Sequence, residues 1–201
     1  MPDRITLGFD TSAAHCAAAL LRGDVLIAHR QEEMAKGQAE RLMPLLEEML
    51  AEAGLAWADL DVIGVGTGPG NFTGIRLGVA AARGLALALE RPAIGVPATE
   101  ALAWGLARPC RIVIPGRGGQ VIWQDLMPEE PEGGSRPQQA ADGALPPGPA
   151  PAAPAVGIAD GVARLARTRA AIGPAPRPAP LYLRPADAAP ARDAPPVILD
   201  T

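Results

Sequence analysis

Three short apolar runs open the chain, at residues 5–10, 15–21 and 25–30. Turn-forming residues separate them, Asp10-Thr11-Ser12 after the first run and Arg22-Gly23-Asp24 after the second. Apolar runs of this length, bounded by tight turns, are typical of strands that pair with their neighbours in sequence. The opening residues are therefore predicted to form three strands joined by hairpin-like turns.

Helices and strands are then expected to alternate. Apolar positions recur at helical spacing over residues 38–54, and a buried strand is predicted at 61–68. A long apolar helix is predicted at 73–89 and a short strand at 92–96, after which Thr99 is expected to cap another helix. Strands that alternate with helices indicate an α/β unit with a mixed sheet.

The second half carries weaker patterns. Residues 111–115 and 120–126 are predicted to be two strands around a glycine turn. Between residues 128 and 157 there are 13 prolines or glycines in 30 positions, so a loop or a disordered segment is expected there. A last helix is predicted near residues 155–166, with Asp160 as its N-cap.

Composition narrows the class of protein. The chain has 201 residues, of which 48% are hydrophobic and only 3% aromatic, so small aliphatic side chains must fill its core. A net charge of −4 argues against a stand-alone nucleic-acid binder, because such proteins usually present a concentrated basic face. The start has no apolar region of signal-peptide length, and Arg76 and Arg83 interrupt the helix at 73–89. A soluble, cytoplasmic protein with no membrane contact is expected, and Cys16 and Cys110 are expected to be free core thiols.

The glycine-rich stretch GTGPGNFTGIR, residues 66–76, stands between a predicted strand and a predicted helix. It is not a Walker A loop, because the only lysine of the chain is Lys36. It also departs from the dinucleotide fingerprint, because Asn71 stands where the third glycine belongs. Asn71 and Thr73 could cap the helix, whose free N–H groups could instead bind an anion. These residues alone leave both interpretations open.

The predicted helix at 73–89 carries a ridge of small residues at four-residue spacing, Gly74, Gly78, Ala82 and Ala86. Glycine in a helix interior costs about 1 kcal/mol relative to alanine, so such a ridge suggests that another backbone comes close. The approaching backbone could belong to the chain's own sheet or to a second subunit, and the spacing does not decide between them.

GTGPGNFTGIRLGVAAARGLAL closely resembles the signature of the TsaB family, bacterial subunits that act in the formation of threonylcarbamoyladenosine in tRNA. ITLGFDTSAAHCAAALL and AIGVPATEALA are similar to other parts of that family, and the resemblance covers residues 4–107. It is thinner at 115–124, 156–163 and 180–188. The resemblance implies an actin/hexokinase/Hsp70-like α/β fold with two related lobes around a cleft. On this basis residues 1–107 are expected to form an intact first lobe with dimerization helices, and 108–201 a reduced second lobe.

The resemblance further implies a non-catalytic scaffold subunit without a securely bound cofactor. It would pair in a heterodimer with a TsaD-type catalytic subunit and join a TsaE-type ATPase, in a complex that uses ATP and Mg²⁺ and to which tRNA binds mainly through the partners. A homodimer remains an alternative. No catalytic or metal-binding residue is expected in the chain. The dimer interface implied by the resemblance is Gly74, Arg76, Gly78, Ala82 and Ala86, and the implied vestigial phosphate or nucleotide contacts are Asp10, Thr11, Gly68 and Gly70.

Other functions remain to be weighed against this expectation. A small-molecule kinase of the same fold would use Asp10 at the end of the first strand, whereas a simpler role for Asp10 is a turn residue that accepts from the Ser12 N–H. An orphan protein-interaction module is a third class. His15 and His29 lie on separate predicted strands, which disfavours a metalloprotease site. Ser12, His15 and Asp10 could be assembled into a triad, but nothing resembles a nucleophile elbow.

Overall fold

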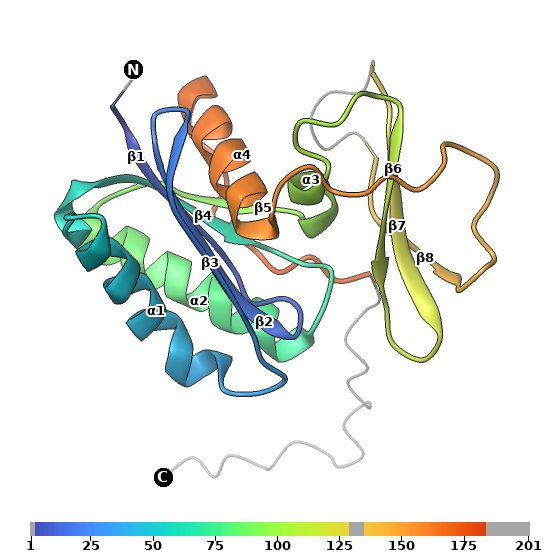
Figure 1. The fold of residues 1–201 in the computed structure, drawn as a ribbon, viewed down its shortest axis with the longest axis horizontal. Helices are drawn as coiled ribbons and strands as arrows, with labels where there is room; N and C mark the ends of the chain where they lie inside the picture. The colour runs from blue at the N-terminus through green and yellow to red at the C-terminus, as the bar shows by residue number, and fades with distance from the viewer. Residues whose placement is uncertain (1–2, 129–134, 184–201) are drawn as a thin grey trace, which may run out of the picture.

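The computed structural model describes residues 3–128 and 135–183. These described residues form two sheets, four α-helices and one 3₁₀ turn before β4 (Figure 1). Their bounds are β1 Ile5–Asp10, β2 His15–Arg22, β3 Val25–Glu33, α1 Gln38–Glu52, η1 Trp57–Asp59, β4 Leu60–Gly66, α2 Phe72–Leu89, β5 Ala93–Val96, α3 Ala98–Leu102, β6 Cys110–Pro115, β7 Gln120–Leu126, β8 Gln138–Ala141 and α4 Ile158–Ile172.

The larger sheet has the strand order β3-β2-β1-β4-β5. The first three strands are antiparallel, as the turns between them predict, and β4 and β5 run parallel to β1. Leu7 at the centre of β1 lies opposite Leu20 on one side and Ile63 on the other. All six residues of β1 are buried, which is expected of a central strand covered on both faces. The predicted α/β class with a mixed sheet is confirmed.

Helices cover both faces of this sheet (Figure 1). On one face α1 and α2 pack over a core that includes Phe9, Leu45 and Leu46. On the other face α4 packs with Ala159 and other small residues against a second apolar cluster. This helix lies very close to β1, because a Cβ added to Gly8 would be 2.6 Å from the backbone nitrogen of Ala163 and 2.7 Å from the carbonyl oxygen of Ala159. Small residues therefore allow backbone to pack on backbone here.

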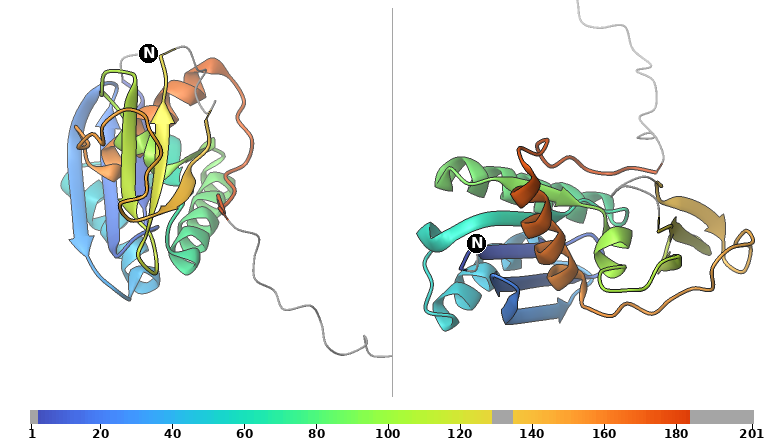
Figure 2. Two further views of the ribbon diagram at one scale, coloured as in Figure 1. Left: turned by 90° about the vertical axis from the view of Figure 1, so that its right-hand side faces the viewer. Right: turned by 90° about the horizontal axis from the view of Figure 1, so that it is seen from above.

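The smaller sheet, β6-β7-β8, stands beside the larger one (Figure 2). Buried Arg111 on β6 donates to both carboxylate oxygens of Asp125 on β7, and its guanidinium also donates to the carbonyl of Pro146. These bonds fix part of the proline-rich segment, which also contains β8. The expectation of a loop or disordered segment at 128–157 is corrected at β8, whereas residues 142–157 form no helix and no strand beyond an isolated bridge at Pro151, as a loop would, and 129–134 lie outside the described residues.

The division of the chain at residue 107 also needs correction. Helix α4 belongs to the second half of the sequence, yet it forms one of the two layers that cover the larger sheet. The extended segment after it, residues 174–183, follows the edge of the same sheet, where the Leu181 N–H donates to the carbonyl of Thr67. The second half therefore completes the first lobe as well as forming the smaller sheet. Part of the stretch 180–188 lies outside the described residues.

Two predicted helix caps are replaced by others. Helix α4 begins after Gly157, and Asp160 lies in its first turn, where it accepts from Arg164. Helix α3 begins after Pro97, and the hydroxyl of Thr99 donates to the side-chain carbonyl of Gln124. In both cases the side chain predicted to cap the helix instead bonds another side chain, Arg164 of the same helix or Gln124 of β7.

Helix α2 has 18 residues with a mean hydropathy of 1.4, and by length and composition it could cross a membrane. This is weak evidence, because a helix packed on a core satisfies the same criteria. Here one side of α2 lies on the sheet and the other side stays exposed. Cys16 and Cys110 are free and buried, as predicted, and burial raises the pKa of the Cys16 thiol to about 11.

Candidate functional site

The glycine turn between β4 and α2 packs against the loop between β1 and β2. A Cβ on Gly70 would lie 2.1 Å from the carbonyl oxygen of Ser12, and the Asn71 N–H donates to that oxygen at 2.5 Å. Gly68 has a φ of +88°, a left-handed conformation that glycine adopts without strain. The glycines of this turn thus allow two segments of the same chain to meet.

The start of α2 is satisfied by the chain's own groups. The Asn71 side-chain carbonyl accepts from the N–H groups of Thr73, at 3.0 Å, and Gly74, at 3.4 Å, as the sequence predicts for an N-cap. The hydroxyl of buried Thr11 donates to the carbonyl of Gly74 at 2.7 Å. Four residues were predicted as phosphate contacts, namely Asp10, Thr11, Gly68 and Gly70. The structure brings the loops that carry them together, but uses Thr11 and Gly70 for internal packing.

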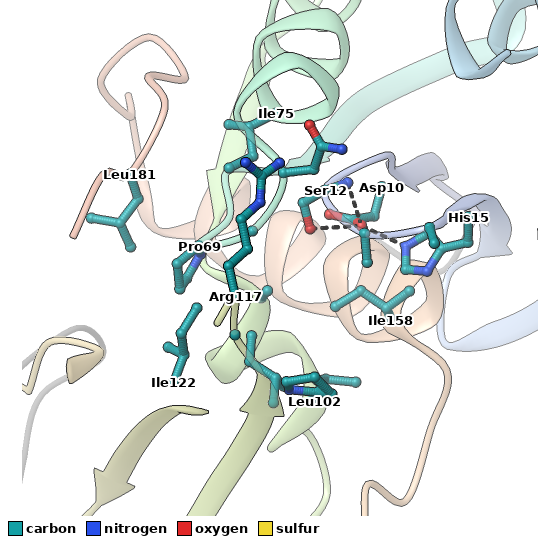
Figure 3. A pocket seen from close by; sticks show the side chains of 18 of the residues that line it. Asp10, Ser12, His15, Pro69, Ile75, Leu102, Arg117, Ile122, Ile158 and Leu181 are labelled. Carbon is teal, nitrogen blue, oxygen red and sulfur yellow. Dashed lines mark hydrogen bonds and ion pairs between the residues drawn. The ribbon is translucent and has the colours of Figure 1, made fainter. Parts of the chain in front are cut away.

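Asp10, at the end of β1, forms the polar centre of the site. Its side chain is fully buried, and its Oδ1 accepts from the Ser12 N–H and the Ser12 hydroxyl, both at 2.9 Å. The same oxygen lies 2.7 Å from His15 Nε2 (Figure 3). The predicted turn role of Asp10 toward Ser12 is confirmed. The contact between Asp10 and His15 belongs to the triad weighed from the sequence, whereas the contact between Ser12 and His15 that a triad also needs is not formed in the described part of the chain.

Opposing influences act on the His15 imidazole. Burial alone lowers its pKa, but the hydrogen bond and charge of Asp10, together with the charge of Glu33, outweigh burial and raise the pKa above 6.5. Glu33 lies opposite His15 on β3. The positively charged form of His15 is therefore favoured beside the Asp10 carboxylate.

The arrangement of these side chains disfavours two enzyme classes, serine hydrolases and metalloproteases. Ser12 and His15 both contact Asp10 Oδ1, and no hydrogen bond joins Ser12 to His15 in the described part of the chain, so no base activates the hydroxyl. Within residues 3–128 and 135–183, no three His, Cys, Asp or Glu side chains gather in a way that could hold a metal ion. His15 and His29 lie on different strands, as predicted.

A cavity of about 1480 Å³ opens next to Asp10, between the two sheets (Figure 3). Its walls come from the β1–β2 loop, the glycine turn, the smaller sheet and the segment after α4. Most of its lining is apolar, with Ile75, Leu102, Ile122 and Leu181 among its residues. Arg117 lines it from the β6–β7 turn. The sequence motifs marked only the Asp10 end of this cavity, because the other walls come from segments far along the chain.

The small-residue ridge of α2 faces the chain's own core. Gly74 and Gly78 are buried against the end of β1, where an added Cβ would lie 1.9 Å from the Thr11 carbonyl oxygen and 2.9 Å from the Thr11 hydroxyl, respectively. Ala82 is fully buried, and Ala86 is half-buried beside the same core. The predicted interface is corrected at Gly74, Gly78 and Ala82, because these positions are buried in the chain's own core, whereas the half-buried Ala86 stays a prediction.

Arg76, the remaining residue of the predicted interface, is exposed and clusters with the aromatic rings of Phe72 and Tyr182. Its guanidinium lies 3.7 Å from the centre of the Phe72 ring, and its Nε donates to the Tyr182 hydroxyl at 2.8 Å. The two rings are 5.2 Å apart. Arg83 on the same helix donates to the carbonyl of Pro178. These contacts attach the segment after α4 to α2 at the rim of the cavity, and no local sequence signal predicted them.

The family model described as "TsaD: tRNA N6-adenosine threonylcarbamoyltransferase" matches residues 28–143. The chain is 33% identical over 129 residues to the tRNA threonylcarbamoyladenosine biosynthesis protein TsaB of Escherichia coli, a match that covers 62% of this chain and 55% of that protein. A protein of the same description from Haemophilus influenzae is 36% identical over 104 residues, covering 51% of this chain and 43% of the relative. The chain thus spans about half the length of these curated relatives.

A solved structure described as YeaZ from Pseudomonas aeruginosa is similar to 90% of this chain and all of that one, with a TM-score of 0.72 and 26% identity. This structural similarity covers a larger share of the chain than the 62% covered by the relative from Escherichia coli.

Proposed function

We propose a function from one premise, that the chain belongs to the TsaD family and within it is a TsaB-type member. The proposed function is that of a cytoplasmic, non-catalytic subunit in the formation of N6-threonylcarbamoyladenosine in tRNA. The chain would act as scaffold for a TsaD-type catalytic subunit, and a TsaE-type ATPase would join the complex. In this proposal ATP and Mg²⁺ serve the wider complex, and tRNA binds chiefly through the partners.

The observation that carries the scaffold role is the exposed apolar side of α2, opposite the ridge that faces the core. Ala80, Gly84, Leu87 and Ala88 are exposed there, and 83% of the Leu87 surface is accessible. Between Ala80 and Ala88 the exposed residues of α2 are apolar apart from Arg83, and an exposed apolar patch on a helix is typical of a surface that another helix covers. This side, which we call the outer face of α2, replaces the corrected interface as the proposed site of pairing with the catalytic subunit.

Gly84 gives a direct test of the outer face. A Cβ at Gly84 would meet no atom within 4 Å, so Gly84→Trp is expected to leave the isolated chain folded. It should prevent pairing, because an indole on a helix-packing face keeps the partner backbone away. Ala144→Trp, on an exposed residue of the smaller lobe, is the matched control. Size-exclusion chromatography of the chain mixed with a TsaD-type subunit measures pairing. Normal pairing by Gly84→Trp would contradict the proposed surface.

The activity test is a reconstituted threonylcarbamoylation assay with the partner subunits and tRNA. Modified tRNA is expected only when the chain is present, and Gly84→Trp should lose this effect while Ala144→Trp keeps it. Equal product without the chain would contradict the proposed function and leave an orphan interaction module. The kinase alternative gains no support from the site, because Asp10 is already engaged by Ser12 and His15.

A further inference from the structure

The cavity between the two sheets has apolar walls that belong to the packed core. Leu102 of α3, Ile122 of β7 and Ile158 of α4 line it from three different elements (Figure 3). Ile158 is buried in the apolar cluster that α4 shares with the larger sheet, and Leu102 packs against the same cluster. These side chains are therefore held in place without a ligand, and a preformed apolar cavity is the usual form of a small-molecule site.

The acidic groups that line the cavity are engaged or exposed. Asp10 accepts from Ser12 and lies 2.7 Å from His15 Nε2. Glu33 is exposed and accepts from the side-chain amide of Gln31 at 2.7 Å. Asp10 is thus balanced by His15, and the charge of Glu33 is screened by solvent. Neither carboxylate therefore excludes an anion from the rest of the cavity.

Arg117 is the contrasting group in the lining. It stands in the turn between β6 and β7, and Figure 3 shows its side chain among those that surround the cavity. Within residues 3–128 and 135–183, no hydrogen bond or ion pair engages its guanidinium. A guanidinium presents its N–H donors in a planar fork that matches the two oxygens of a carboxylate. Arg117 is therefore available to an anionic group in the cavity.

From the apolar walls and this guanidinium we infer that the cavity binds an aliphatic carboxylate. The carboxylate pairs with Arg117, and the hydrocarbon chain lies along the walls that Leu102 and Ile122 form. Charge complementarity selects the anionic end, and the walls select a chain without further polar groups, because buried polar groups need partners. The inference goes beyond the proposed scaffold role and does not rest on it, since it concerns the cavity and not the outer face of α2.

The same surroundings disfavour a nucleotide, the ligand that an actin/hexokinase/Hsp70-like fold implies for a cleft between lobes. Phosphate groups would use the N–H donors at the start of α2, but those of Thr73 and Gly74 are taken by the Asn71 side chain. A ribose and a triphosphate would also bring many polar atoms against apolar walls, at a cost in desolvation. An aliphatic chain meets neither obstacle.

Isothermal titration calorimetry of the full chain with octanoate and decanoate, below their micelle-forming concentrations, tests the site. Decanoate should bind about tenfold more tightly than octanoate, because its longer chain removes more apolar surface from water. Equal affinity for the two would show that the walls do not receive the chain and would overturn the inference. ATP should not displace decanoate, and displacement by ATP would assign the cavity to nucleotides instead.

Arg117→Met separates recognition of the carboxylate from burial of the chain. The variant should bind octanoate about tenfold more weakly, because a charge-assisted pair is lost, and should bind uncharged 1-octanol as the native chain does. Arg91→Met, at an exposed position outside the cavity lining, is the matched control and should leave both affinities unchanged. An equal loss for octanoate and 1-octanol, or no loss for either, would mean adventitious binding of apolar molecules and would overturn the inference.

Leu181→Asp tests the position of the ligand independently. Leu181 lines the cavity from the extended segment after α4 and is half-buried, so its replacement leaves both sheets intact. The new carboxylate should weaken decanoate binding at least about tenfold, because it adds a like charge and a polar group to the apolar wall. Leu87→Asp, on the outer face of α2, is the matched control, and circular dichroism checks the fold of both variants. Unchanged binding by a folded Leu181→Asp chain would place the ligand elsewhere and overturn the inference.

Discussion

The larger sheet is covered by helices on both faces, whereas the smaller sheet depends to a greater extent on polar contacts. Beneath α4 the packing is so close that backbone of the helix touches backbone of the strand at Gly8. The apolar cluster of the smaller sheet holds four buried residues, Ala103, Cys110, Ile112 and Leu126, and the Arg111–Asp125 pair joins its strands. The comparison teaches that the first region should be sensitive to added volume and the second to lost hydrogen bonds.

The largest effect is expected from Gly8→Val. The added carbons would overlap the backbone of Ala163 and Ala159, and α4 would have to move off the sheet. A loss of about 4 kcal/mol or more in unfolding free energy is expected, enough to unfold many domains of this size. Urea denaturation followed by circular dichroism measures it. Gly84→Val, which places the same side chain in open space, is the control, and equal stability of the two variants would contradict the close packing of α4 on β1.

Arg111→Met should have an intermediate and local effect. The variant removes the bonds to Asp125 and to the Pro146 carbonyl while it keeps much of the side-chain volume. A loss of about 2 kcal/mol is expected, because Asp125 is left without its partner. Hydrogen exchange should accelerate in residues 135–152 and stay unchanged in β1. Arg117→Met, at an exposed position, is the matched control, and a uniform loss of protection over both sheets would contradict the distinction between them.

Gly84→Ala is expected to stabilise the isolated chain by about 1 kcal/mol, because alanine is the better helix former and the added methyl group meets nothing. Gly78→Ala on the same helix should not, since its methyl group would lie 2.9 Å from the Thr11 hydroxyl. The two melting temperatures, measured side by side, sharpen the comparison between the exposed and the buried side of α2. A destabilised Gly84→Ala would show that the outer face is packed in the isolated chain.

The smallest effect concerns pH at the boundary between the two regions. Burial opposes the charge of His15 but the hydrogen bond and charge of Asp10 prevail, so its folded-state pKa lies above the unfolded value near 6.5. The pair therefore contributes its full stability below pH 6.5 and loses it as the pH rises through the folded-state pKa. Unfolding free energy measured from about pH 6 to 8 should fall with a slope that Asp10→Asn removes. His29→Ala should keep the slope, and a native chain with the slope of Asp10→Asn would refute the ion pair.

The order of the opening strands could be predicted because their turn residues and apolar runs are local signals. The same holds for the Asn71 cap and for the contact of Asp10 with Ser12. The orientation of α2 could not be predicted, because a row of small residues is compatible with either a sheet or a second subunit beside it. Gly74 and Gly78 of the small-residue ridge face Thr11, and only the three-dimensional path of the chain after β1 reveals this.

The remaining differences come from contacts between residues far apart in sequence. Arg111 fixes a segment that is rich in proline and glycine by bonds to carbonyl groups, and no pattern of side chains in that segment announces them. The cavity wall near Leu181 depends on a backbone hydrogen bond to Thr67. Because every residue has such backbone groups, the residue types at these positions do not predict the bond. Long-range pairing therefore accounts for most of what the sequence left open.

The position of α4 also has a consequence for synthesis on the ribosome. All five strands of the larger sheet precede residue 97, but the helix that covers one face ends at Ile172. A chain that emerges at about 5–20 residues per second exposes that apolar face for several seconds before α4 follows. The nascent first lobe is thus a natural client for chaperones that bind apolar surface. Its native state can be reached only once residues 158–172 have left the exit tunnel.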